Sequence, residues 1–219
     1  MLSDLPALVG LDPGELKAIL ADGGIVLDVR PGDAFAAGHV PGSVNIALSG
    51  QFASWAGALL GLATRPVLIA ESEEAVAEGR MRLARIGLED AAGYLKGGVE
   101  AWKKAGLPLA QIAQITVDLL SRRSPDGAVQ VLDVRREREW DEGHIEGASW
   151  WPLDNFKVSP PEIDRAVPLA VHCKGGYRSM IACSLLQRAG FQNVVNVVGG
   201  FDAWQAAKLP VSVEKPVHA

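Results

Sequence analysis

The stretch "AVHCKGGYRSM", residues 170–180, combines residue types that could transfer a chemical group through a sulfur atom. Cys173 follows a short apolar run and is itself followed by two glycines, an arginine and a serine. Adjacent glycines allow backbone N–H groups to turn toward one centre, and Arg178 adds a positive charge. Both features stabilise a thiolate, which is the nucleophilic form of cysteine. The pattern therefore predicts a reactive Cys173 that forms a covalent intermediate.

The elements around Cys173 should place it where α/β proteins bind ligands. Residues 168–172 form a continuous apolar run typical of a buried strand, and residues 178–190 show helical spacing. In open α/β sheets, ligands bind outside the carboxyl ends of the strands. The start of the following helix adds its positive end to the charges of Lys174 and Arg178. We therefore expect the loop "CKGGYRS" to form an anion cradle.

Three segments return later in the chain in the same order. The shift is 105 residues for the first two and 102 for the third: "IVLDVR" (25–30) as "QVLDVR" (130–135), "GHVPGS" (38–43) as "GHIEGA" (143–148), and "LKGGVEAW" (95–102) as "VVGGFDAW" (197–204). This period is far longer than one unit of a solenoid protein. The sequence therefore predicts two copies of one domain, with a boundary between Gly106 and Gln114.

Strand and helix patterns alternate within each copy. Residues 66–70 form an apolar run like that of residues 168–172, and Asp12 begins a capped helix. Gly87 and Gly190 stand where helix-ending glycines are expected. Each copy should therefore be a small open α/β domain with a mostly parallel sheet.

Several other candidate residues are better explained by the fold than by chemistry. The Asp-x-Arg pairs and the histidines of "GH" recur in both copies, and we expect each pair to join a strand end to a turn; they are Asp28, Arg30, His39, Asp133, Arg135 and His144. Gly199 and Gly200 should form a tight turn. Cys183 should be buried mid-helix, and strand alternation should turn His172 away from Cys173.

Three stretches of the second copy together resemble the signatures of the rhodanese sulfurtransferases. The first is the loop, with four residues between Cys173 and Arg178; the others are "LDVRREREWDEGHIEGA" (132–148) and "GGFDAW" (199–204). The resemblance extends to both copies. It implies two rhodanese-like domains, each a five-stranded mostly parallel sheet flanked by helices.

The resemblance also implies a reaction. Cys173 would carry a persulfide, with sulfur arriving from thiosulfate or a small-molecule or protein persulfide and leaving to a thiol or cyanide. No cofactor or metal ion is expected. The main chain of the loop would cradle the sulfur, so the expected substrate-binding residues are Lys174, Gly175, Gly176, Tyr177, Arg178 and Ser179.

The first copy departs from the loop pattern. Aligning "RPVLIAES" with "VPLAVHCK" puts Glu71 in the place of Cys173, within an acidic loop that has no Gly-Gly. A carboxylate cannot carry sulfane sulfur, and its charge repels anions. We therefore expect residues 1–108 to be a rhodanese-like domain without the catalytic cysteine, and residues 115–212 to be the catalytic domain.

Composition excludes several other classes of function. The 219 residues carry a formal net charge of -5, which argues against a nucleic-acid-binding surface. No apolar run approaches the ~20 residues of a membrane span, and the start lacks the pattern of a signal peptide. The 2 cysteines provide no disulfide framework. We expect a cytoplasmic protein with no nucleic-acid or membrane partner; its oligomeric state stays open.

Two other functions remain as alternatives. A cysteine-dependent phosphatase could use a related fold, although the dual-specificity phosphatases of that fold have five residues between Cys and Arg. A non-enzymatic tandem scaffold would not need the intact loop at Cys173. The tandem arrangement with a degenerate first copy is also similar to the rhodanese part of fusions with persulfide dioxygenases.

Overall fold

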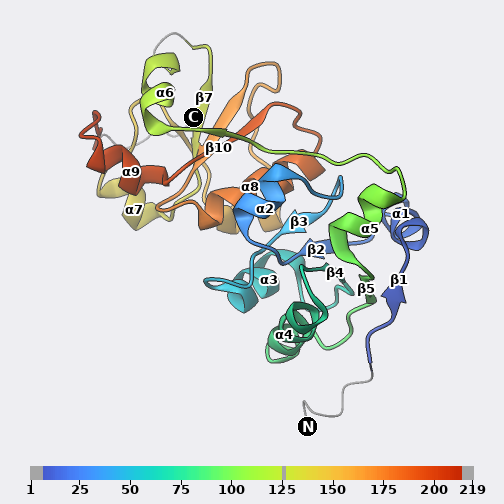
Figure 1. The fold of residues 1–219 in the computed structure, drawn as a ribbon. Helices are drawn as coiled ribbons and strands as arrows, with labels where there is room; N and C mark the ends of the chain where they lie inside the picture. Colours follow the sequence, from blue (N-terminus) through green and yellow to red (C-terminus); the bar gives the residue numbers. More distant parts are fainter. Residues whose placement is uncertain (1–6, 125–126, 214–219) are drawn as a thin grey trace. The chain divides into compact units, whose positions relative to one another are not determined.

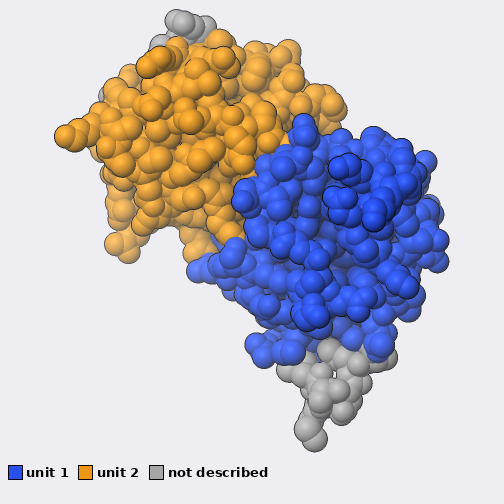
Figure 2. All heavy atoms as spheres, in the orientation of Figure 1, with its two compact units in different colours: residues 1–111 blue, residues 112–219 orange. Residues whose placement is uncertain are grey.

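The computed structural model describes residues 7–124 and 127–213. The chain divides into two compact units, residues 1–111 and residues 112–219 (Figure 2). Each unit holds one sheet of five strands, and every strand pairing in the described residues is parallel. The α/β fold expected from the sequence is confirmed, with sheets that are fully rather than mostly parallel.

Unit 1 has the strand order β1-β5-β4-β2-β3 (Figure 1). Its strands are β1 (Gly10–Leu11), β2 (Val26–Asp28), β3 (Val44–Asn45), β4 (Val67–Ile69) and β5 (Gly93–Leu95). Its helices are α1 (Pro13–Ala21), α2 (Gly32–Ala37), α3 (Phe52–Leu60), α4 (Glu73–Ala84) and α5 (Gly98–Lys104). The predicted cap of α1 is confirmed, because Asp12 and Glu15 form a reciprocal capping box.

Unit 2 repeats this topology with the order β6-β10-β9-β7-β8. Its strands are β6 (Ala113–Ile115), β7 (Gln130–Asp133), β8 (Ser149–Trp150), β9 (Leu169–His172) and β10 (Val194–Val197). Its helices are α6 (Val117–Arg123), α7 (Glu137–Asp141), α8 (Tyr177–Arg188), α9 (Gly200–Ala206) and the short 3-10 helix η2 (Leu153–Lys157). The helix-ending glycines are confirmed at Gly87 and Gly190, where φ is +87° and +90°.

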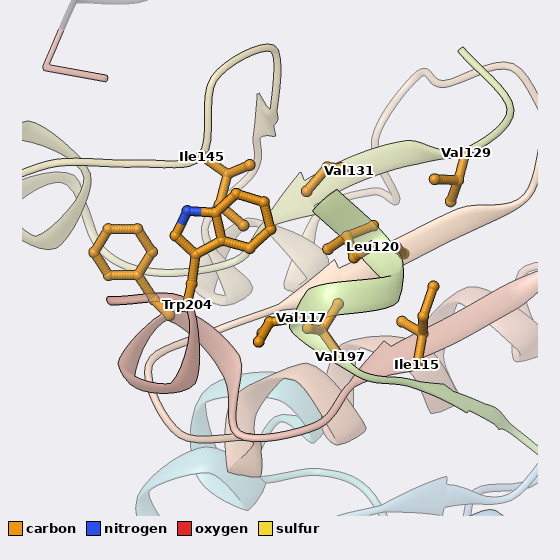
Figure 3. Close-up of a cluster of buried hydrophobic side chains, with 10 residues drawn as sticks. Ile115, Val117, Leu120, Val129, Val131, Ile145, Val197 and Trp204 are labelled. Carbon is orange, nitrogen blue, oxygen red and sulfur yellow. The ribbon is translucent and has the colours of Figure 1, made fainter. Parts of the chain in front are cut away.

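A cluster of buried apolar side chains joins α6 and α9 to the sheet of unit 2 (Figure 3). Its members are Ile115, Val117, Leu120, Val129, Val131, Ile145, Ala170, Val197, Phe201 and Trp204. Trp204 Nε1 also donates a hydrogen bond of 2.8 Å to Pro210 O, and Trp102 makes the same bond to Pro108 in unit 1. Trp102 and Trp204, which recur in the two copies, therefore fix the chain segment that follows the last helix of each unit.

The recurring Asp-x-Arg pairs tie a strand end to a turn, which confirms their predicted role in the fold. Each arginine Nη2 donates both to the carboxylate and to a glycine carbonyl: Arg30 to Asp28 (2.7 Å) and Gly38 (2.9 Å), Arg135 to Asp133 (2.6 Å) and Gly143 (2.7 Å). The histidines next to these glycines stack on aromatic rings of α2 and α7. The ring centroids lie 3.8 Å apart for His39 and Phe35, and 3.7 Å apart for His144 and Trp140.

The strand registers correct the alignment of the two copies at the loop. Asp28 pairs with Ile69 of β4, whereas its counterpart Asp133 pairs with His172 of β9. Ile69 therefore occupies the position of His172, and the next residue, Ala70, occupies that of Cys173. The prediction that Glu71 replaces Cys173 is wrong by one residue.

The last helix of each unit gives independent support for this register. A Cβ placed on Gly98 would lie 2.8 Å from Ala70 O, and one on Gly200 would lie 2.4 Å from Cys173 O. The error arose because the alignment rested on the prolines that precede the strands. β4 begins opposite Val26 of β2, whose counterpart in β7 is Val131. β9 begins one residue earlier, opposite Gln130, so Pro66 and Pro168 do not occupy equivalent positions.

Candidate active site

Cys173 lies between the carboxyl end of β9 and the start of α8, as the sequence predicts. Gly176 precedes α8 with φ +110°, a value that side-chain-bearing residues rarely adopt. Its N–H points at Cys173 Sγ with a nitrogen–sulfur distance of 3.1 Å. Cys173 is 1% exposed. The loop therefore holds the sulfur against a backbone donor at the positive end of a twelve-residue helix.

A chain of polar side chains continues from the buried sulfur to Gln114 on the edge strand β6. Cys173 Sγ lies 3.6 Å from Ser179 Oγ, which lies 2.7 Å from Asn196 Oδ1. Asn196 Nδ2 in turn donates to Gln114 Oε1 at 2.7 Å. Sequence reasoning missed Asn196 and Gln114. The signal for Asn196 was a polar residue inside the apolar run "VVNVV" of a central strand, where a buried amide needs a partner.

The turn at Gly199 and Gly200 holds the loop from the side of α9. Both glycines have positive φ, +73° and +56°, which confirms the predicted tight turn. The turn brings the N–H of Phe201 to 2.8 Å from Cys173 O, and that of Asp202 to 3.0 Å from Lys174 O. The start of α9 therefore binds the two carbonyl groups that begin the loop.

Arg178 is turned toward α7. Its Nη1 and Nη2 donate to the two carboxylate oxygens of Glu139 at 2.6 and 2.7 Å. The hydrogen bond from Arg178 holds the pKa of Glu139 below its usual value, and the same bond raises the pKa of Arg178. Sequence reasoning missed Glu139. The side chain of Lys174 is exposed, so Lys174 and Arg178 occupy different surroundings.

His172 lies buried behind the loop. Its Nδ1 is 3.3 Å from Cys173 O, and its Nε2 is 3.6 Å from Asp133 Oδ2, beyond hydrogen-bond length. Its ring stacks at 6.2 Å on Phe201. Burial lowers the pKa of this imidazole, so its neutral form is favoured. These contacts give His172 a position in the core beneath the loop.

Cys183 is fully buried in the middle of α8, so the prediction that it belongs to the core is confirmed. Burial raises the pKa of its thiol, with the neighbouring Cys173 as a smaller cause.

Trp150 packs on Trp140 at 5.9 Å between ring centroids, and its Nε1 donates to Arg135 O at 3.0 Å. These side chains therefore serve the fold around the site.

The described residues contain neither a candidate metal site nor a candidate membrane-spanning helix. No group of three or more His, Cys, Asp or Glu side chains in residues 7–124 and 127–213 could hold a metal ion. Over the same residues, no helix has both the length and the apolar character needed to span a membrane.

Comparison with known proteins relates this arrangement to one family. A model of the "Rhodanese-like domain" matches residues 12–105 and again residues 116–207. Thiosulfate sulfurtransferase GlpE of Shewanella oneidensis is 30% identical over 99 residues, covering 45% of this chain and 98% of that protein. A sulfurtransferase of Allochromatium vinosum is 31% identical over 101 residues, covering 46% and 94%.

A third relative is longer than the segment that it shares with this chain. The putative sulfur carrier protein YrkF of Bacillus subtilis is 28% identical over 110 residues, and the match spans 50% of this chain and 57% of that protein. The expected relation to persulfide dioxygenase fusions stays a prediction. Because the family model matches twice and covers most of the chain, the chain belongs to the rhodanese-like family and carries two of its domains in tandem.

Proposed function

We propose that this chain is a sulfurtransferase that carries sulfane sulfur on Cys173. The observation that carries the proposal is the N–H of Gly176, 3.1 Å from Sγ at the start of α8. A backbone donor and the positive end of a helix both stabilise negative charge on a sulfur atom held at this position. Relatives named as sulfurtransferases support the same reaction class.

In the first half-reaction, the thiolate of Cys173 attacks the outer sulfur of the donor and forms a new S–S bond. The S–S bond of the donor breaks at the same time. Its electron pair leaves on sulfite when the donor is thiosulfate, and on a thiolate when the donor is a persulfide. In the second half-reaction, a thiol or cyanide attacks the outer sulfur, and the Cys173 thiolate leaves. Sulfur moves in both steps without an external oxidant.

The main chain of residues 174–179 is the proposed cradle for the outer sulfur. Gly175 and Gly176 carry no side chain that would crowd an added sulfur atom. The hydroxyl of Ser179, 3.6 Å from Sγ, is close enough to reorient toward a charged sulfur. Lys174 and Tyr177 are the proposed contacts for the rest of the donor.

Unit 1 is proposed to take no part in the chemistry. Ala70 occupies the position of Cys173, so the two loops are related by a shift of 103 residues. The same shift places Ala75 and Val76 at the positions of Arg178 and Ser179. The Gly-Gly is replaced by Ser72 and Glu73, and α4 begins at Glu73 with Ser72 as its cap. That loop therefore lacks the thiol, the glycines and the cation together.

The decisive experiment is steady-state sulfur transfer from thiosulfate to cyanide, combined with mass spectrometry of the donor-treated protein. We expect wild type to gain one sulfur atom, removable by dithiothreitol, and to turn over. Cys173→Ser should do neither, whereas the matched variant Cys183→Ser should do both, because Cys183 is buried in the core. Persulfide on Cys173→Ser, or loss of activity in folded Cys183→Ser alone, would overturn the assignment.

A second variant tests the role of unit 1. The double variant Ala70→Cys/Cys173→Ser places a thiol at the equivalent position without the rest of the cradle. We expect no turnover above that of Cys173→Ser. Recovery of a substantial fraction of wild-type activity would show that unit 1 still provides a working site.

A further inference from the structure

The ion pair between Arg178 and Glu139 occupies both terminal nitrogens of the loop arginine. Bidentate pairs of this kind are among the strongest charge-assisted contacts in proteins. The two side chains are only 16% and 27% exposed, so solvent screens them less than a surface pair. The guanidinium edge that could bind an anionic donor is therefore engaged by a carboxylate of the chain itself.

Glu139 is fixed from its own side as well. It stands in the first turn of α7, where its Oε2 accepts a hydrogen bond from the N–H of Arg136 at 3.2 Å. This contact and the two from Arg178 hold the carboxylate between α7 and the start of α8. Glu139 therefore keeps its charge beside the loop and does not behave as a freely rotating surface side chain.

The pair occurs only in the unit that carries the thiol. α2 and α7 are counterparts, with Pro31 and Arg136 as their caps, so Ala34 stands at the position of Glu139. Ala75 stands at the position of Arg178. The buried Asp-x-Arg pairs are kept in both units because the fold needs them. The Glu139–Arg178 pair is absent from unit 1, so it belongs to the site rather than to the common fold.

We propose that Glu139 is a specificity-determining residue that directs the Cys173 site toward thiol-borne persulfides and away from dianionic donors such as thiosulfate. This inference rests on the proposed sulfurtransferase function. With Glu139 in place, the charge of Arg178 is cancelled at the loop, and Lys174 is the remaining cation of residues 173–179. One cation matches a persulfide, which carries at most one negative charge at its sulfur. Thiosulfate carries two.

The test compares two donors on four proteins, with cyanide as acceptor. The donors are thiosulfate and the persulfide of 2-mercaptoethanol, whose carrier has no charge of its own. The proteins are wild type, Glu139→Gln, Glu139→Gln/Arg178→Ala and the matched control Glu142→Gln. Glu142 pairs with Arg138 near the end of the same helix, but that pair is solvent-exposed, so its loss changes the net charge equally without freeing a loop cation.

We expect Glu139→Gln to raise kcat/KM for thiosulfate on the order of tenfold, because the freed guanidinium attracts a dianion more than a monoanion. The value for the persulfide should change about threefold or less, so the ratio of the two should shift toward thiosulfate. The gain should disappear in the double variant, and Glu142→Gln should keep the wild-type ratio.

An unchanged or decreased thiosulfate-to-persulfide ratio in Glu139→Gln would overturn the inference, as would an equal shift in Glu142→Gln. A merely structural pair would lower activity with both donors to the same extent. Loading of Cys173 is measured by mass spectrometry in the same samples. If neither donor loads Cys173 in any of the four proteins, the proposed function itself fails and the inference fails with it.

Discussion

Replacing Gly200 by alanine should disable the loop of Cys173 through the backbone, without touching any side chain of the site. The added Cβ would lie 2.4 Å from Cys173 O and 2.6 Å from Lys174 O. Carbon–oxygen contacts of this kind essentially never fall below 3.0 Å, so the start of the loop must move away from α9. This displacement also lengthens the hydrogen bonds that the N–H groups of Phe201 and Asp202 donate to the same two carbonyl groups.

The expected size of the effect follows from these distances. Relief of the closer contact requires a displacement of at least about 0.6 Å, and a misplacement near 1 Å can cost about 100-fold in rate. We therefore expect kcat/KM to fall about 10- to 100-fold, or ~1.4 to 2.7 kcal/mol. The φ of +56° adds about 1–2 kcal/mol of backbone strain to the native state.

The assay is thiosulfate–cyanide transfer by the full chain, with folding checked by circular dichroism under the same conditions. Unit 1 supplies a matched control, because Gly98 has φ +57° and its Cβ would lie 2.8 Å from Ala70 O. Gly98→Ala should lose stability but keep kcat/KM within about twofold, since no thiol follows β4. Wild-type kinetics in folded Gly200→Ala, or an equal loss in Gly98→Ala, would refute the argument.

Two further predictions concern stability. Arg135→Ala should lower the free energy of unfolding, measured by urea titration, by about 3–5 kcal/mol, because the fully buried Asp133 loses its bidentate partner. A loss below about 1 kcal/mol would contradict this expectation. Because burial raises the pKa of Cys183, the unfolded chain releases that proton first, and stability should fall as pH rises above about 9. In this pH range, Cys183→Ala should reduce the slope of unfolding free energy against pH by about 1.4 kcal/mol per pH unit. Identical slopes for wild type and Cys183→Ala would show that Cys183 does not lose its proton on unfolding.

Much of the fold could be predicted from the sequence because the signals for it are local or repeated. Apolar runs and helical spacing identify strands and helices from neighbouring residues alone, and the capping box at Asp12 lies within four residues. The position of Cys173 between β9 and α8 follows from the same kind of pattern. The recurrence of the Asp-x-Arg pairs separated residues of the fold from residues of the site. These inferences needed no knowledge of which segments meet in space.

Contacts between distant segments could be decided only by the tertiary structure. Glu139 lies 39 residues before Arg178, and Gln114 lies 82 residues before Asn196. The first pair meets where α7 approaches the start of α8, and the second where β6 pairs with β10, because crossover connections bring these separate elements side by side. The replacement of Cys173 by Ala70 depended on a one-residue difference in strand register, which apolar runs do not reveal. Spacing alone placed a cation near the thiol, but the packing of α7 against the start of α8 decided that this cation is already paired.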